Sequence, residues 1–135
     1  MAFPSDINKF SRVAKQRLTE AQILLKNELW AAAIYLAGYA IECSLKALLI
    51  SLTPAGARPT IVKSLKDDFG HNLRRLRAGV VSKKVNIPEN VASALLFASS
   101  WSPDLRYEPG PGDPEEANRF IAAAKVVVEW ASARI

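Results

Sequence analysis

The sequence predicts an all-α protein, an up-and-down bundle of four main helices with one or two short helices. Three observations support this class. Apolar residues recur at steps of three and four through long segments, helix-capping residues stand where those segments begin, and no segment has a convincing strand pattern. A chain of 135 residues, half of them hydrophobic, suits one domain with its own core, so we expect a single helical domain over residues 1–135.

The first two helices are the longest. One is predicted from Ser5 or Asp6, either of which can cap it, to Lys26, and the next from about Glu28 to Leu52. The apolar face of the first comprises Ile7, Phe10, Ala14, Leu18, Ala21, Leu24 and Leu25. The second has a stripe of small residues that lets another helix approach closely: Ala33, Ala37, Ala40, Ser44 and Ala47.

The middle of the chain is predicted to contain only short helices. Residues 55–59 are expected to form a loop, and residues 60–69 a short helix. Another short helix, over residues 72–78, would begin next to His71 and end with Gly79 in the C′ position.

The last third of the chain has clearer helix signals. Pro88 suits the first position of a helix that runs to about Ser99, and "SPDLRYEPGPGDP" is expected to be an irregular loop. Asp113 is a good N-cap for the final helix, since Pro114 and two glutamates follow it. The expected apolar face of that helix is Ala117, Phe120, Ile121, Ala124, Val128 and Ala131.

The second helix carries two opposite charges within an otherwise apolar segment. Glu42 and Lys46 are four residues apart, so they share a helical face, on which Tyr35, Tyr39 and Leu49 also lie. The pair either stands at the edge of the core with its charges in water or faces a groove or a second subunit. We expect a pair that is at least half buried and hydrogen-bonded to a tyrosine or to a neighbouring helix.

Composition disfavours several broad classes of protein. Glu42 and Lys46 make a membrane crossing by the second helix costly, so we expect no membrane association. Cys43 is the only cysteine, which excludes an intramolecular disulfide, and with no secretory signal pattern in residues 1–10 we expect a cytoplasmic protein. The net charge of +5 suits a nucleic acid or nucleotide partner, and it is equally compatible with a basic protein that has neither.

No metal or cofactor is expected. One His and one Cys cannot form a closed zinc site within the chain, and "GPG" at 110–112 lacks the lysine of a phosphate-binding loop. A nucleophilic pair of Cys43 and His71 is formally possible, but a cysteine inside an apolar helix is more often an inert core residue.

Three segments, taken together and in order, resemble the HEPN domains, the higher-eukaryote and prokaryote nucleotide-binding family. "YLAGYAIECSLKALLI" resembles the family's second-helix motif, in which Lys follows Glu by four residues. "GHNLRRL" resembles its His-acid/amide-Leu-x-x-Leu element, and "SPDLRYEPG" its Arg-Tyr-Pro-type loop before the last helix. The resemblance implies a helical bundle, usually dimeric, in which the helix of Glu42 and Lys46 helps to form a shared cleft. It also implies either a partner of a small nucleotidyltransferase or a metal-independent endoribonuclease, often a toxin.

The sequence departs from the nuclease members in one motif. Those members carry Arg four to six residues before His, whereas here the nearest arginine upstream of His71 is Arg58, thirteen residues away, and Arg74 and Arg75 follow the histidine. We therefore expect no RNA cleavage, and a His71 that has a capping or packing role with a ring nitrogen bonded to a carbonyl.

The expected function is a non-catalytic module that forms a homodimer, because its second helix is apolar on so many sides, and that binds a nucleotide, RNA or a nucleotidyltransferase partner. The alternative is an endoribonuclease toxin of a toxin–antitoxin pair with an atypical His71 and Arg106 site. A structural subunit whose charge is incidental is the third possibility. The candidate nucleotide- or phosphate-binding residues are Tyr39, Glu42, Lys46, His71, Arg74, Arg75, Arg106 and Tyr107. The arginines can equally form a solvated face, and Tyr107 with Trp101 can simply pin the loop.

Overall fold

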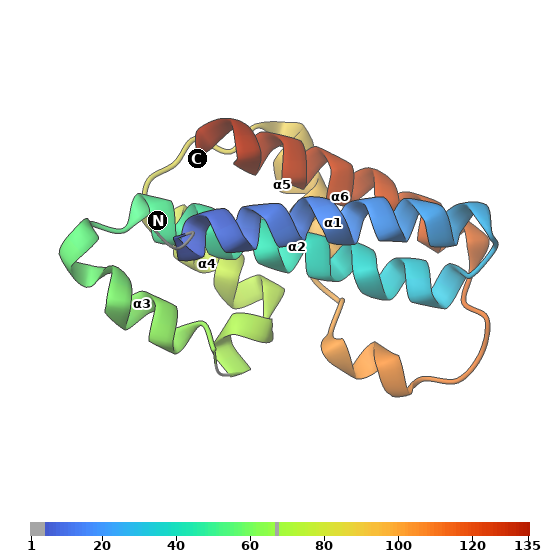
Figure 1. The fold of residues 1–135 in the computed structure, drawn as a ribbon. Helices are drawn as coiled ribbons and strands as arrows, with labels where there is room; N and C mark the ends of the chain where they lie inside the picture. The colour runs from blue at the N-terminus through green and yellow to red at the C-terminus, as the bar shows by residue number, and fades with distance from the viewer. Residues whose placement is uncertain (1–4, 67) are drawn as a thin grey trace.

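The computed structural model describes residues 5–66 and 68–135, which form only helices and their connections (Figure 1). The α-helices are α1 (Asp6–Lys26), α2 (Trp30–Leu52), α3 (Arg58–Ser64), α4 (Leu73–Ser82), α5 (Glu89–Ala98) and α6 (Pro114–Arg134). Short 3₁₀ helices connect them: η1 (Ala55–Ala57), η2 (Asp68–His71) and η3 (Pro103–Tyr107). The predicted all-α bundle is confirmed.

Helix α2 is the centre of the bundle. It packs against α1, α4 and α6, and α5 covers α6. The segments that contain α3 and η3 extend to the same side of the α1–α2 pair in Figure 1. These two segments flank one face of α2.

The small-residue stripe of α2 explains why this helix can be so deeply covered. Residues 40–50 are all buried, and so are Ala33 and Ala37, because small side chains allow the neighbouring helices to approach. By length and composition α2 could cross a membrane, yet 83% of its most apolar window is buried inside the fold, as in the core helix of a bundle. The chain therefore covers most of α2 by itself.

The predicted helix starts at both ends of the chain are confirmed by their caps. The Ser5 side chain accepts a hydrogen bond from the Asn8 backbone N–H at 3.2 Å, and Asp113 accepts one from the Glu116 N–H at 2.7 Å. These caps satisfy donors that the first turn of each helix leaves free. The expected apolar face of α6 is buried as predicted, from Ala117 to Ala131.

The predicted boundaries in the middle of the chain are partly wrong. The expected loop at 55–59 contains η1 and the start of α3, because Pro59 occupies the second helical position, where its missing N–H costs nothing. Helix α3 ends at Ser64, short of the predicted 60–69 range, of which residue 67 lies outside the described residues.

Three other local predictions also need correction. Gly79 lies inside α4, which continues to Ser82 because the buried positions repeat through Val80. His71 ends η2 and does not start a helix, and Pro88 precedes α5 as its extended N-cap. The proline-rich loop after α5 contains η3, whose start is capped by the Ser102 side chain.

Candidate functional site

One face of α2 borders an open hollow, which we call the α1–α2 groove. Its volume is about 350 Å³. It is lined by Phe10, Val13, Arg17, Tyr35, Leu36, Tyr39, Glu42, Cys43 and Lys46. The groove combines aromatic and aliphatic walls with a few polar groups, which is the usual composition of a small-molecule site.

Glu42 and Lys46 form a buried ion pair in this groove. The Lys46 Nζ lies 2.9 Å from the Glu42 Oε2, and the two side chains are only 6% and 3% exposed. The ammonium also lies 5.4 Å from the centre of the Phe10 ring, within the range of a cation–π contact. The expectation that the pair is at least half buried is confirmed.

His71 brings the η2 segment onto the same carboxylate. Its Nδ1 lies 3.3 Å from both Glu42 oxygens, and its side chain is 45% exposed. The expected hydrogen bond from the pair to a tyrosine or to a neighbouring helix is confirmed in its second form, because His71 belongs to η2. The His71 ring nitrogen contacts this carboxylate, where a carbonyl was expected. The preceding residue is Gly70, where an added Cβ would overlap the Leu65 carbonyl oxygen. Only glycine therefore lets the backbone before His71 pass this close to Leu65.

The N-terminal end of the groove is aromatic. The Tyr35 and Tyr39 rings pack edge to face at 4.9 Å, and Tyr39 packs in the same way on Trp101 at 5.1 Å. Trp101 is buried against Gly38, where an added Cβ would lie 2.0 Å from the indole. Trp101 therefore pins the loop after α5 to α2, as one of the sequence interpretations held.

Arg106 reaches this aromatic end from η3. The Tyr35 hydroxyl, and after it the Tyr107 hydroxyl, raises the pKa of the fully exposed Arg106. The guanidinium lies 4.8 Å from the centre of the Tyr107 ring, which is 72% exposed. Arg106 is therefore positioned beside the groove, whereas Tyr107 faces water and does not pin the loop.

Burial controls the titration of the two other reactive groups in the groove. It is the main cause that raises the pKa of Tyr39, and it raises the pKa of the Cys43 thiol to about 11. At neutral pH the thiol is protonated, which makes Cys43 a poor nucleophile.

The eight candidate residues thus separate into two sets. Tyr39, Glu42 and Lys46 line the groove, His71 joins it through Glu42, and Arg106 joins it through Tyr35. The remaining candidates, Arg74, Arg75 and Tyr107, are exposed outside it.

Sequence reasoning missed the wall of the groove that α1 supplies. Phe10, Val13 and Arg17 are spaced by three and four residues, so they share a face of α1. Arg17 interrupts an apolar face, in the same way that Glu42 interrupts α2, and that pattern could have identified it.

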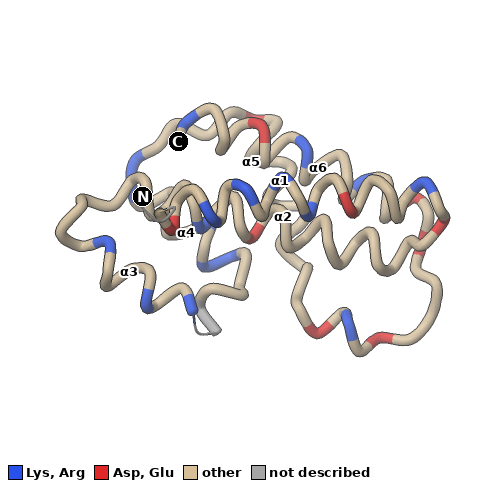
Figure 2. Tube along the Cα trace, in the orientation of Figure 1, with Lys and Arg blue, Asp and Glu red and all other residues tan. Residues whose placement is uncertain are grey.

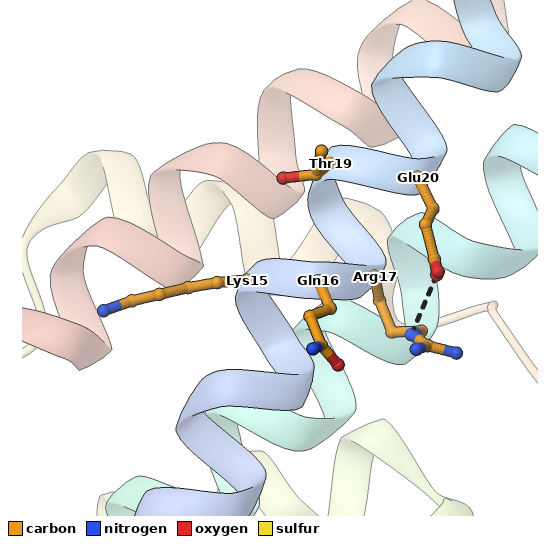
Figure 3. Close-up of a pocket in the computed structure, with 5 residues that line it drawn as sticks. All are labelled: Lys15, Gln16, Arg17, Thr19 and Glu20. Atoms are coloured by element: carbon orange, nitrogen blue, oxygen red, sulfur yellow. Dashed lines mark ion pairs between the residues drawn. The ribbon is translucent and has the colours of Figure 1, made fainter.

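A second hollow, of about 440 Å³, lies on the outer surface of α1. It is lined by Lys15, Gln16, Arg17, Thr19 and Glu20. These side chains point in different directions, and the polar contact drawn between them is the Arg17–Glu20 pair at 2.9 Å (Figure 3). Polar groups do not converge there, so we assign no site to it. The residues that the structure describes also contain no His, Cys, Asp and Glu group that could hold a metal ion.

Comparison with known proteins agrees with the helical architecture. The model of the HEPN domain matches residues 7–134, which is nearly the whole chain. Searches of curated proteins and of solved structures gave no match. Because this match covers nearly the whole chain, including the helices from α1 to α6 that the structure describes, the chain belongs to the HEPN domain family.

Proposed function

We propose that this protein is a non-catalytic HEPN module that binds a nucleotide, free or within RNA, in the α1–α2 groove. The observation that carries the proposal is the buried Glu42–Lys46 pair beside two tyrosine rings in an open hollow. A buried ion pair contributes little net stability, and apolar packing of the same volume is often as good. Charged groups kept at the wall of a hollow are therefore better explained by a ligand.

The groove offers a distinct contact for each part of a nucleotide. Tyr35 and Tyr39 provide aromatic surface for a base, and the Glu42 carboxylate can accept from an exocyclic amine. Arg17 within the groove and Arg106 beside it can hold phosphate oxygens in the planar, two-point geometry that arginine favours.

Titration of the purified protein with labelled ATP tests this proposal. Arg17→Gln should weaken binding about tenfold or more, since a hydrogen bond to a charged group contributes roughly 1.5–3 kcal/mol. Arg12→Gln is the matched control, because Arg12 is exposed on α1 and does not line the groove. Equal binding by both variants, or no binding by the parent protein, contradicts the proposal.

The endoribonuclease alternative gains one observation from the structure. The Glu42 carboxylate holds His71 at Nδ1, an arrangement that orients an imidazole for proton transfer at its other nitrogen. Incubation of clean protein with RNA should nevertheless give no cleavage, because the Arg-then-His spacing is missing. Cleavage that His71→Ala abolishes would establish the enzyme, and growth arrest on expression would favour the toxin.

We also propose a homodimer, on the strength of the family resemblance. Residues 40–50 of α2 are buried within the chain, so the interface must use other surfaces. Leu96 on α5 is 64% exposed and is the first position to test. Light scattering should give twice the chain mass of 14.8 kDa, and a monomer at micromolar concentration contradicts the proposal.

We also propose a nucleotidyltransferase partner, from the family resemblance, and a cytoplasmic location, from the features of the sequence. Co-purification with a nucleotidyltransferase encoded by a neighbouring gene would support the partner. Fractionation of expressing cells addresses the location.

A further inference from the structure

The net positive charge of the protein comes from one segment, residues 58–84, which we call the basic arm. The arm contains α3, η2 and α4. It holds eight of the eighteen Lys and Arg but only two of the thirteen Asp and Glu, so its formal charge is +6 while the rest of the chain carries −1. In Figure 2 the coloured positions along α3 and α4 are blue, whereas blue and red are mixed on α1, α2 and α6.

Six of the eight basic side chains of the arm are exposed to solvent. The exposed ones are Lys63, Lys66, Arg74, Arg75, Lys83 and Lys84. Among the described residues, the ion pairs are Arg17 with Glu20 and Glu42 with Lys46 and His71, so none of them neutralises an arginine or lysine of the arm. Helix α3 has no buried residue at all. The arm therefore presents its cations outward.

The chemistry of this surface fits phosphates better than a protein. Among the arm residues whose side chains the structure describes, Val81 is the only large hydrophobic one that is strongly exposed. The segment contains no Trp or Tyr, and Phe69 is its single Phe. Protein–protein interfaces enrich aromatic residues at their core and deplete Lys, whereas nucleic-acid backbones are held mainly by Arg and Lys. A surface dominated by arginine and lysine contacts phosphates and does not distinguish bases.

The arm also touches the groove directly. His71, the last residue of η2, lies 3.3 Å from the Glu42 carboxylate, and α4 with Arg74 and Arg75 follows at once. Helix α4 has ten residues and is therefore about 15 Å long. One strand carries a negative charge about every 3.4 Å along a duplex, so several phosphates can lie along α4.

We propose that the basic arm binds the phosphate backbone of an RNA strand, one nucleotide of which occupies the α1–α2 groove. This inference rests on the proposed function and adds a second, sequence-independent surface to it. The groove recognises one nucleotide, and the arm supplies most of the affinity that depends on salt.

The test measures RNA binding against salt. The probe is an unstructured RNA of about 16 nucleotides, the upper end of common single-strand site sizes. The arm variants are Arg74→Gln with Arg75→Gln, and Lys63→Gln with Lys66→Gln. The control is Lys26→Gln with Lys125→Gln, which removes two exposed lysines from α1 and α6.

Each arm variant should bind the RNA more weakly than the control at about 150 mM salt, and should flatten the plot of log affinity against log salt. Loss of two phosphate contacts should reduce that slope by about 1.4, since each single-strand contact contributes about 0.7. Arm variants that match the control in both affinity and slope overturn the proposal, and so does a parent protein that does not bind the RNA. Equal affinity for DNA of the same sequence overturns the assignment to RNA.

The test separates this proposal from the groove proposal. The arm variants should bind ATP like the parent, because none of the changed residues lines the groove. If ATP does not bind but RNA affinity depends on the arm, the groove assignment fails and the backbone surface stands.

Discussion

Glu42 is a buried carboxylate that contacts two basic side chains. Its carboxylate is 3% exposed and lies against both Lys46 and His71. Glu42→Ala leaves the Lys46 ammonium buried without its partner, so the free energy of unfolding should fall by about 3–5 kcal/mol. The double variant Glu42→Ala, Lys46→Ala should lose less than the sum of the single changes, because no charge is then left alone.

Urea denaturation followed by circular dichroism measures these effects. Glu20→Ala is the control, because Glu20 pairs with Arg17 at the surface and should contribute less than about 0.5 kcal/mol. If Glu42→Ala unfolds at the same urea concentration as Glu20→Ala, the pair is not energetically buried.

The packing around Gly38 predicts whether Gly38→Ala raises or lowers the stability of the protein. Glycine inside a helix is normally worse than alanine by roughly 1 kcal/mol, so Gly38→Ala would ordinarily stabilise α2. Here the new Cβ would lie 2.0 Å from the Trp101 indole, and Trp101 must move. We expect a lower melting temperature and a red-shifted Trp fluorescence. Gly56→Ala, with no atom within 4 Å of its new Cβ, should leave both unchanged, and a stabilised Gly38→Ala would contradict the packing.

Sequence alone predicts residue-scale features only where they are local. The Glu42–Lys46 pair follows from a spacing of four on one helix, and its burial follows from its apolar surroundings. The contact between His71 and Glu42 joins residues 29 positions apart, so it depends on how η2 packs on α2 and no local pattern encodes it. The contact of Gly38 with Trp101 is hidden for the same reason.

At the scale of elements, caps were predictable and some ends were not. Ser5 and Asp113 mark their helices because a side-chain oxygen satisfies free N–H groups in the first turn, which is a local effect. The end of α4 was not predicted in this way. Gly79 indicated that the helix ends before it, but Leu76 and Val80, on either side of Gly79, are both buried. Their packing extends the helix to Ser82. Tertiary burial outweighed the local preference of one glycine.

The turn between α1 and α2 contains a strained residue. Glu28 has a φ of 60°, in the left-handed region that a side chain disfavours by roughly 1–2 kcal/mol. Glu28→Gly should therefore raise the free energy of unfolding by up to about 1 kcal/mol, after allowing for the greater freedom of glycine in the unfolded chain.

Thermal or urea unfolding checks this prediction. Gln16→Gly, at an exposed position in the interior of α1, is the control and should destabilise by about 1 kcal/mol. Loss of stability in both variants would show that the left-handed geometry at Glu28 carries no strain.

At the scale of the whole molecule, one helix organises the fold. Helices α1, α4 and α6 pack directly on α2, and α5 is held mainly through α6. The sequence could predict this central role from the length and composition of α2. It could not show how completely the chain covers α2, since that depends on the combined positions of α1, α4 and α6.

This organisation predicts unequal stability along the chain. All residues 40–50 of α2 are buried, whereas α3 has no buried residue. Amide hydrogens of α2 should therefore exchange only when the whole domain unfolds, and those of α3 by local opening that costs far less. Hydrogen exchange followed by mass spectrometry on overlapping peptides measures both.

Exchange in α3 as slow as in α2 would contradict this hierarchy. The same experiment connects stability with function, because a ligand that binds only the folded arm must suppress its local opening. With RNA added, exchange should slow in α3 and α4 and stay unchanged in α6, whose exposed face carries no part of the arm. A uniform slowing of all helices would instead indicate that RNA stabilises the bundle as a whole, and the separate role of the arm would be wrong.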